Sequence, residues 1–290
     1  LPSIISSIRK KIVDCGGEFL FEKKVVDFII KDHEIKGVKT ADGNSFEGRA
    51  FMLATGHSAR DIFGLLHSKK ILIESKAFAL GVRVEHPQTL IDSAQYHHST
   101  PLNANCPRDP FLPAASYSWV QQVDGKAVFS FCMSPGGIIA PAATSPGELV
   151  VNGWSPSKRN NPYANSGIVV AVEEKDVQSF KKYGALAGMY FQQSVEWKAF
   201  ETGGGKFVAP SQRLVDFTDN KLSSSLPDCS YSPGIHSASL KEVLPGFIHK
   251  SLQQAFKEFG KKMKGYFTNE AVVLATESRT SSPVRIPRDA

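Results

Sequence analysis

Residues 78–87 are Phe78-Ala79-Leu80-Gly81-Val82-Arg83-Val84-Glu85-His86-Pro87, a stretch in which apolar and other side chains alternate. The large apolar side chains share one face of an extended backbone, whereas Gly81, Arg83 and Glu85 share the other. A period of two residues is typical of a half-buried strand. This stretch therefore predicts one long strand of a sheet.

Further strands are expected downstream, and Pro- and Gly-rich loops separate them. The predicted strands are 116–123, 127–133, 148–152 and 167–173, and the main loops are 134–147 and 153–166. Two helices follow, at 176–199 and 245–263, with Pro245 suited to the first turn of the second. The Ser-rich segment 218–239 is expected to be a surface loop. This part of the chain is predicted to be mostly antiparallel.

In the residues before Phe78, the predicted elements are short and closely spaced. Apolar residues at helical spacing predict an amphipathic helix over 3–15, which Gly16-Gly17 would end. Short strands are expected at Phe19–Phe21, 25–30 and 35–38, with a turn at Asp42-Gly43. Residues Ala50 to Ala54 are all apolar, as expected of a strand that is covered on both faces. This last strand ends in Thr55-Gly56.

Composition bounds the class of protein. The 290 residues are 41% hydrophobic and 21% charged, which is typical of a globular chain, and no apolar run approaches the length of a membrane span. The net charge of +6 comes from scattered lysines, so a solvated surface is favoured over nucleic-acid binding. The four cysteines show no C-x-x-C pair, and His97 and His98 would point to opposite faces of a strand. Neither a disulfide framework nor a metal site is predicted.

The order of elements in the first 56 residues resembles the end of the FAD-binding domain in flavoproteins of the glutathione-reductase type. In that family, a three-stranded meander precedes an apolar strand that ends in Ala-Thr-Gly, as in Ala54-Thr55-Gly56. The glycine lets the backbone approach the flavin nucleotide. A glycine at the carboxyl end of a parallel strand leaves room for a ligand for the same physical reason.

Stretches along nearly the whole chain resemble the FAD-dependent, or NAD(FAD)-utilising, dehydrogenases of bacteria and plastids. The matching stretches are 54–61, 78–87, 131–137, 152–153, 165–166, 186–188, 203–213 and 277–285. The resemblance implies FAD as cofactor, NAD(P) as a further candidate and a small-molecule substrate. It also favours a chloroplast location, with the cytoplasm as the alternative.

The resemblance also implies where the cofactor would lie. The turn after the predicted apolar strand is expected beside the flavin or its pyrophosphate, and its candidate residues are Ala54, Thr55, Gly56, His57, Ser58 and Arg60. The alternative for this turn is a helix start with Ser58 as N-cap and Asp61 three residues later. A second candidate set suits an anionic ligand or the flavin edge, or forms a solvated loop: Arg279, Thr280, Ser281 and Arg285.

Two features of the family pattern are absent from this sequence. No strand is followed by a G-x-G-x-x-G turn, and Gly203-Gly204-Gly205 follows a predicted helix instead. The Gly-rich closing segment of the family, which is expected after Ala290, is also absent, so the chain is expected to be the middle of a longer protein. Relatives often carry a second cysteine where this sequence has Ser134, so Cys132 is expected to be a small buried side chain rather than half of a redox disulfide.

Together these patterns predict an α/β fold with α+β character in its larger part. A partial FAD-binding domain with Rossmann-type topology is expected over 1–61, a substrate-side domain over 62–270 and a return segment over 271–290. The predicted function is hydride transfer through FAD between an unknown substrate and a nicotinamide or other acceptor. The alternative is a non-catalytic or RNA-linked binding protein that keeps the flavoprotein fold.

Overall fold

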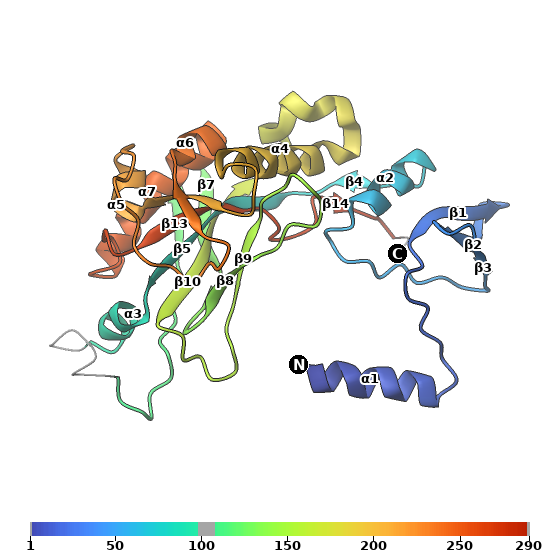
Figure 1. Cartoon of the computed structure of the whole chain (residues 1–290). Helices are drawn as coiled ribbons and strands as arrows, with labels where there is room; N and C mark the ends of the chain where they lie inside the picture. The colour runs from blue at the N-terminus through green and yellow to red at the C-terminus, as the bar shows by residue number, and fades with distance from the viewer. Residues whose placement is uncertain (1, 98–107, 289–290) are drawn as a thin grey trace. The chain divides into compact units, whose positions relative to one another are not determined.

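The computed structural model describes residues 2–97 and 108–288 (Figure 1). The chain divides into two units, Leu1–Ile71 and Leu72–Ala290. Each unit has its own secondary structure and is described separately below. No helix in the described ranges is long and apolar enough to cross a membrane.

The smaller unit contains an antiparallel three-stranded meander between two helices. Its elements are α1 (Pro2–Asp14), β1 (Val25–Lys31), β2 (Glu34–Thr40), β3 (Ser45–Glu47) and α2 (Arg60–Ser68). The turn between β2 and β3 is closed by Asp42, which accepts hydrogen bonds from Thr40 and Asn44. Gly43 lies in this turn at φ +86°, where a side chain would be strained. The helix, two of the predicted strands and the turn are confirmed, but no strand forms at Phe19–Phe21.

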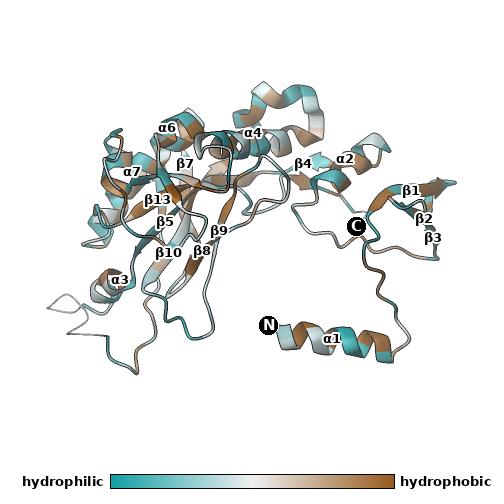
Figure 2. Cartoon of the chain, viewed as in Figure 1, coloured by the Kyte–Doolittle hydropathy of each residue, from teal (hydrophilic) through white to brown (hydrophobic). Residues whose placement is uncertain are grey.

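The strand predicted from Ala50 to Ala54 does not form, and this prediction is wrong for the chain as described. These residues have no strand pairing, and Met52 is 92% exposed. An apolar strand needs neighbouring strands to satisfy its backbone and cover its side chains, and the described residues supply none here. Figure 2 shows hydrophobic residues along α1 as well, and none of its residues is buried. The smaller unit therefore leaves much apolar surface uncovered.

The larger unit is built on a seven-stranded sheet. The strand order is β12-β11-β13-β5-β10-β7-β6, and β5 (Phe78–Pro87) lies at its centre. The other strands are β6 (Val120–Val123), β7 (Lys126–Ser134), β10 (Tyr163–Val172), β11 (Ala209–Arg213), β12 (Ile235–Ser237) and β13 (Val272–Glu277). Every pair except β11 with β12 is antiparallel. The expectation of a mostly antiparallel sheet is confirmed, and the fold has α+β character.

Helices and a hairpin cover this sheet. Helix α7 (Gly246–Lys262) packs on β5, β6, β7 and β10, and α4 (Ala187–Thr202) packs on β11 and β13. The hairpin of β8 (Ile138–Pro141) and β9 (Val151–Trp154) packs against β7, β10 and β13. Leu80, Val82 and Val84 are fully buried in the core. The shorter elements are β4 (Glu74–Ser75), α3 (Gln88–Gln95), α5 (Leu214–Thr218), α6 (Leu240–Val243) and β14 (Val284–Arg285).

Several predicted boundaries in the larger unit are wrong. The helix predicted at 176–199 is a 3-10 helix, η1 (Glu174–Leu186), followed by α4, because the backbone turns at Gly184 with φ +56°. The predicted loops contain β8 and β12, and β11 and β13 were not predicted. Residues 148–150 are buried without being a strand, since β9 begins at Val151.

Candidate functional site

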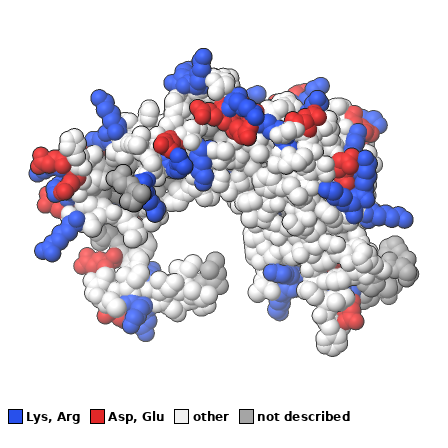
Figure 3. Space-filling view, turned by 180° about the vertical axis from the view of Figure 1, so that it is seen from behind, with Lys and Arg blue, Asp and Glu red and all other residues white. Residues whose placement is uncertain are grey.

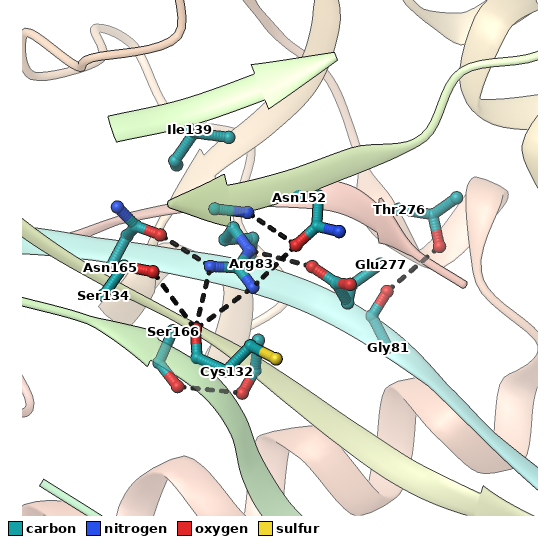
Figure 4. A network of polar contacts seen from close by, with 12 residues as sticks. Gly81, Arg83, Cys132, Ser134, Ile139, Asn152, Asn165, Ser166, Thr276 and Glu277 are labelled. Atoms are coloured by element: carbon teal, nitrogen blue, oxygen red, sulfur yellow. Dashed lines mark hydrogen bonds and ion pairs between the residues drawn. The ribbon is translucent and has the colours of Figure 1, made fainter. Parts of the chain in front are cut away.

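Arg83 lies at the centre of a buried polar network on the sheet (Figure 4). Its side chain is fully buried, which is uncommon for arginine. Its Nε donates to Glu277 Oε2 at 2.8 Å, and its Nη1 donates to Asn165 Oδ1 at 2.6 Å. The three residues come from the adjacent strands β13, β5 and β10. The sheet therefore holds the guanidinium in one fixed orientation.

A β-bulge at Cys132 places a backbone carbonyl on this guanidinium. Phe131 pairs with Gly167 and Ser134 pairs with Asn165, so β7 has one extra residue in this interval. Cys132 has φ +47°, and its carbonyl oxygen accepts hydrogen bonds from Arg83 Nη1 at 3.3 Å and Nη2 at 3.4 Å. Figure 4 shows the carbonyl directed at Arg83 and the thiol directed away from it.

The thiol of Cys132 is exposed, so the expectation of a buried Cys132 is wrong. The bulge is the reason, because it turns a side chain out of the regular alternation of β7. Partial burial and the Glu277 carboxylate raise the pKa of the Cys132 thiol, although Arg83 acts in the opposite direction. The thiol is therefore mostly protonated at neutral pH and is a weak nucleophile.

Gly153 lets the hairpin approach Arg83 closely. A Cβ atom at this position would lie 2.0 Å from Arg83 Nη1 and 2.1 Å from Asn165 Oδ1. The preceding residue, Asn152, accepts a hydrogen bond from Gly153 N at 2.7 Å and lies 3.5 Å from Arg83 Nη2 through its Oδ1. Only glycine fits between the hairpin and the guanidinium.

Two polar atoms beside Arg83 lack hydrogen-bond partners among the described residues. They are Glu277 Oε1 and Asn165 Nδ2, and both side chains are almost completely buried. Burial raises the pKa of Glu277, and the Arg83 guanidinium offsets only part of this effect. Buried polar atoms without partners are rare in native folds and mark places where water or a ligand group can bind.

The Arg83 cluster, defined as Arg83, Cys132, Asn152, Asn165 and Glu277, unites stretches that are far apart in the sequence. Arg83 and Glu277 are 194 positions apart. Five of the stretches that carry the family resemblance contribute to the cluster or to its immediate pairing: 78–87, 131–137, 152–153, 165–166 and 277–285. The sequence predicts no binding or catalytic role for these residues, and for Cys132 it predicts only a small buried side chain. The sequence signal that could have pointed to them is that Arg83 and Glu277, which have opposite charges, each lie next to an apolar run.

The candidate residues at the C-terminal end mostly have partners within the chain. Arg279 donates to Glu148 at 2.7 Å and to Glu196 at 3.0 Å, and both carboxylates are fully buried. Thr280 Oγ1 donates to the Ala79 carbonyl at 2.9 Å. The exposed Arg285 pairs with Glu74, and Ser281 is partly buried.

The candidate residues of the smaller unit follow one another in an irregular segment. Ala54, Thr55, Gly56 and His57 are exposed, and Gly56 has φ +78°. Ser58 is not the N-cap of α2. That position is Ala59, which cannot supply a side-chain hydrogen bond, and Arg60 is the first helical residue. The proposed Ser58 capping arrangement is therefore wrong.

No cluster of three metal-binding side chains occurs in ranges 2–97 and 108–288. His98, half of the histidine pair considered above, lies outside the described residues, as does Cys106.

A family model described as "FAD-dependent protein, C-terminal domain-like" matches residues 77–280. An uncharacterized protein of the bacterium Clostridium beijerinckii is 38% identical over 294 residues, which include all of this chain and 53% of the relative. The chain thus spans about half the length of this curated relative. A bacterial relative gives the chloroplast expectation no support.

Proposed function

The chain belongs to the family of FAD-dependent proteins whose C-terminal domain it matches, and from this we propose that it is part of a flavin-dependent oxidoreductase. The larger unit is the proposed substrate-side domain, and the smaller unit is the proposed end of an FAD-binding domain. The observation that carries the proposal is the Arg83 cluster. Its residues lie within the matched range, come from five separated stretches and surround one buried guanidinium.

The exposed side of the Arg83 cluster is suited to contact with a flavin or with its substrate. The exposed Cys132 and the partly exposed Asn152 offer a thiol and an amide group for contact, and both are held by Arg83. The buried guanidinium supplies positive charge below this surface, which favours a ligand that gains electron density. FAD, when bound, supplies the two-electron acceptor or donor, and the protein supplies position and electrostatics.

The smaller unit fits a nucleotide through its irregular segment. Gly56 has a left-handed backbone, and a Cβ atom there would meet nothing within 4 Å, so this backbone is open to a ligand. Ala54, Thr55, His57, Ser58 and Arg60 remain proposed nucleotide contacts. Since the sequence has no G-x-G-x-x-G turn, we propose that a longer protein, like the relative, supplies the remaining contacts and the strands that pair with residues 50–54.

Arg279 and Thr280 have a different proposed role. Their hydrogen bonds to buried groups fix the segment after Glu277, which keeps that carboxylate beside Arg83. Ser281 and Arg285 remain proposed ligand contacts.

Arg83→Lys in the full-length protein tests the proposal. Lysine keeps the charge but cannot contact Glu277, Asn165 and the Cys132 carbonyl at once. Reduction of bound FAD by NADH or NADPH should slow by on the order of 100-fold while the flavin content stays unchanged. Arg108→Lys is the control, because Arg108 also pairs with a buried carboxylate, that of Asp92, and lies outside the Arg83 cluster. It should lower the melting temperature and leave reduction within a few fold.

Equal effects of both variants on flavin reduction would contradict the assigned role of Arg83. The alternative of an RNA-linked binding protein requires salt-sensitive RNA binding without flavin reduction. Figure 3 shows Lys and Arg beside Asp and Glu over the face that it presents, which does not favour that alternative.

A further inference from the structure

Gln88 is a buried glutamine at the junction of β5 and α3. It is the first residue of α3 and is 4% exposed. Its Nε2 donates hydrogen bonds to Asp92 Oδ1 at 2.8 Å and to the Ala115 carbonyl at 3.1 Å. Its Oε1 accepts a hydrogen bond from Gly136 N at 2.6 Å. Both amide hydrogens and the carbonyl oxygen are in use, so the side chain is held in one orientation.

The contact with Gly136 ties Gln88 to the end of the bulged strand. Strand β7 ends at Ser134, and Gly136 lies in the short connection from β7 to β8. Gln88 directly follows β5, which carries Arg83. The segment that contains Arg83 and Gln88 therefore meets the end of β7 at two points. Arg83 binds the Cys132 carbonyl, and Gln88 binds the Gly136 amide.

The bulge at Cys132 shifts the register of the end of β7 by one residue. Ser134 pairs with Asn165, whereas a ladder without the bulge would pair Met133 with Asn165. In that regular register, Cys132 would lie opposite the fully buried Ser166. Neighbouring residues of a strand point to opposite faces, so this position is on the side of the sheet away from the Arg83 cluster. The thiol would then be buried.

Pro135 makes the Gln88 contact specific for the bulged register. Without the bulge, each residue after Cys132 moves by one position, and Pro135 takes the place of Gly136 beside Gln88. Proline has no backbone N–H to donate. The Gln88 carbonyl oxygen would then be buried without its donor, which is costly. The contact therefore favours the bulged register over the regular one.

We propose that Gln88 is a positioning residue that selects the bulged register of β7 and thereby keeps the Cys132 thiol exposed at the Arg83 cluster. In the other register, the thioether of Met133 would replace the Ser134 hydroxyl beside Asn165, and the surface would lose its thiol. This choice of register does not require bound FAD, so its failure would leave the proposed function untouched.

Gln88→Met in the full-length protein tests the proposal. Methionine has a similar length and fills the same space, but it does not replace the amide. The Gly136 amide then loses its acceptor in the bulged register, whereas Pro135 loses nothing in the regular one. Alkylation of Cys132 by iodoacetamide, followed by mass spectrometry of each cysteine, should slow by on the order of 10-fold. The exposed Cys15 in the same sample should react at an unchanged rate.

Gln212→Met is the matched control. Gln212 is 2% exposed, its Nε2 donates to the Lys221 carbonyl at 2.6 Å, and its Oε1 accepts from Leu240 N at 2.8 Å. This variant should also lower the melting temperature, but it should leave the alkylation rate of Cys132 unchanged. A purely structural role of Gln88 predicts the opposite direction, because local loosening speeds alkylation. An unchanged or faster rate at Cys132 in Gln88→Met would overturn the proposal.

Gln88→Glu provides a second variant if Gln88→Met does not fold. Glutamate keeps an acceptor for the Gly136 amide, but when ionised it cannot donate to Asp92 or Ala115. We expect a lower melting temperature together with alkylation of Cys132 within a few fold of the wild-type rate. Slow alkylation in Gln88→Glu would also overturn the proposal, because the register would then not depend on the acceptor for Gly136.

Discussion

Close contact with Arg83 explains why residue 153 is glycine. Since a Cβ atom would overlap both Arg83 and Asn165, Gly153→Ala must displace the hairpin or the guanidinium. Overpacking of this kind costs about 1–3 kcal/mol, and displacement of a buried charge from its partner adds to that cost. We expect Gly153→Ala to lower the free energy of unfolding by about 2 kcal/mol or more, as measured by urea denaturation.

Gly246→Ala is the matched control for this substitution. Gly246 is the first residue of α7, and a Cβ atom there would meet nothing within 4 Å. Its replacement should leave the unfolding free energy nearly unchanged. If Gly153→Ala were equally neutral, the close approach of β9 to Arg83 would be disproved.

Single residues also show where sequence reasoning reaches its limit. The polar face of β5 could be predicted, because alternation places Gly81, Arg83 and Glu85 together. The exposure of Cys132 could not be predicted, because it depends on a bulge that forms only when β7 pairs with β10. The raised pKa of Glu85 also depends on the fold, because burial in the assembled sheet raises it and outweighs the opposing hydrogen bonds from Ser230, 145 positions away.

At the scale of elements, α4 is tied to the end of β13 by a buried ionic group. Glu196 of α4 accepts hydrogen bonds from Arg279 and from the Ser278 hydroxyl, and Glu148 also binds Arg279. Glu196→Ala would leave Arg279 with one carboxylate and Ser278 without its acceptor. Because breaking a buried pair is costly, the free energy of unfolding should fall by about 3 kcal/mol in chemical denaturation.

Glu201→Ala serves as the control for that experiment. Glu201 is on the same helix, but it is exposed. Its replacement should change stability by no more than about 0.5 kcal/mol. Equal effects of the two substitutions would show that the ion pairs of Arg279 do not hold α4 on the sheet.

Elements with a strong local period were the ones predicted correctly. Strand β5 and helix α7 have clear apolar faces, and both were found close to their expected bounds. Helix η1 and α4 were merged, because their apolar spacing continues across Gly184. The apolar segment 50–54 was predicted as a strand from its composition alone, yet it has no partner strand among the described residues.

For the whole molecule, the resemblance indicates the family, and the geometry supplies the proposed site. The family model confirms an FAD-dependent family but names no reaction. The candidate contacts predicted from the sequence are Ala54–Ser58, Arg60, Arg279–Ser281 and Arg285, whereas the structure shows a polar network around Arg83 that joins strands far apart in the chain. Long-range strand pairing brings these residues together, and local patterns carry no information about it.

The central claim is that the exposed surface of the Arg83 cluster faces the flavin or its substrate in the full-length protein. The most direct test is the alkylation rate of Cys132 in full-length protein with and without FAD, with Lys257→Cys on the exposed surface of α7 as a reference thiol. We predict that FAD slows alkylation of Cys132 by on the order of 10-fold and leaves the reference thiol unchanged. An unchanged rate at Cys132, under conditions where FAD is bound, would contradict the claim.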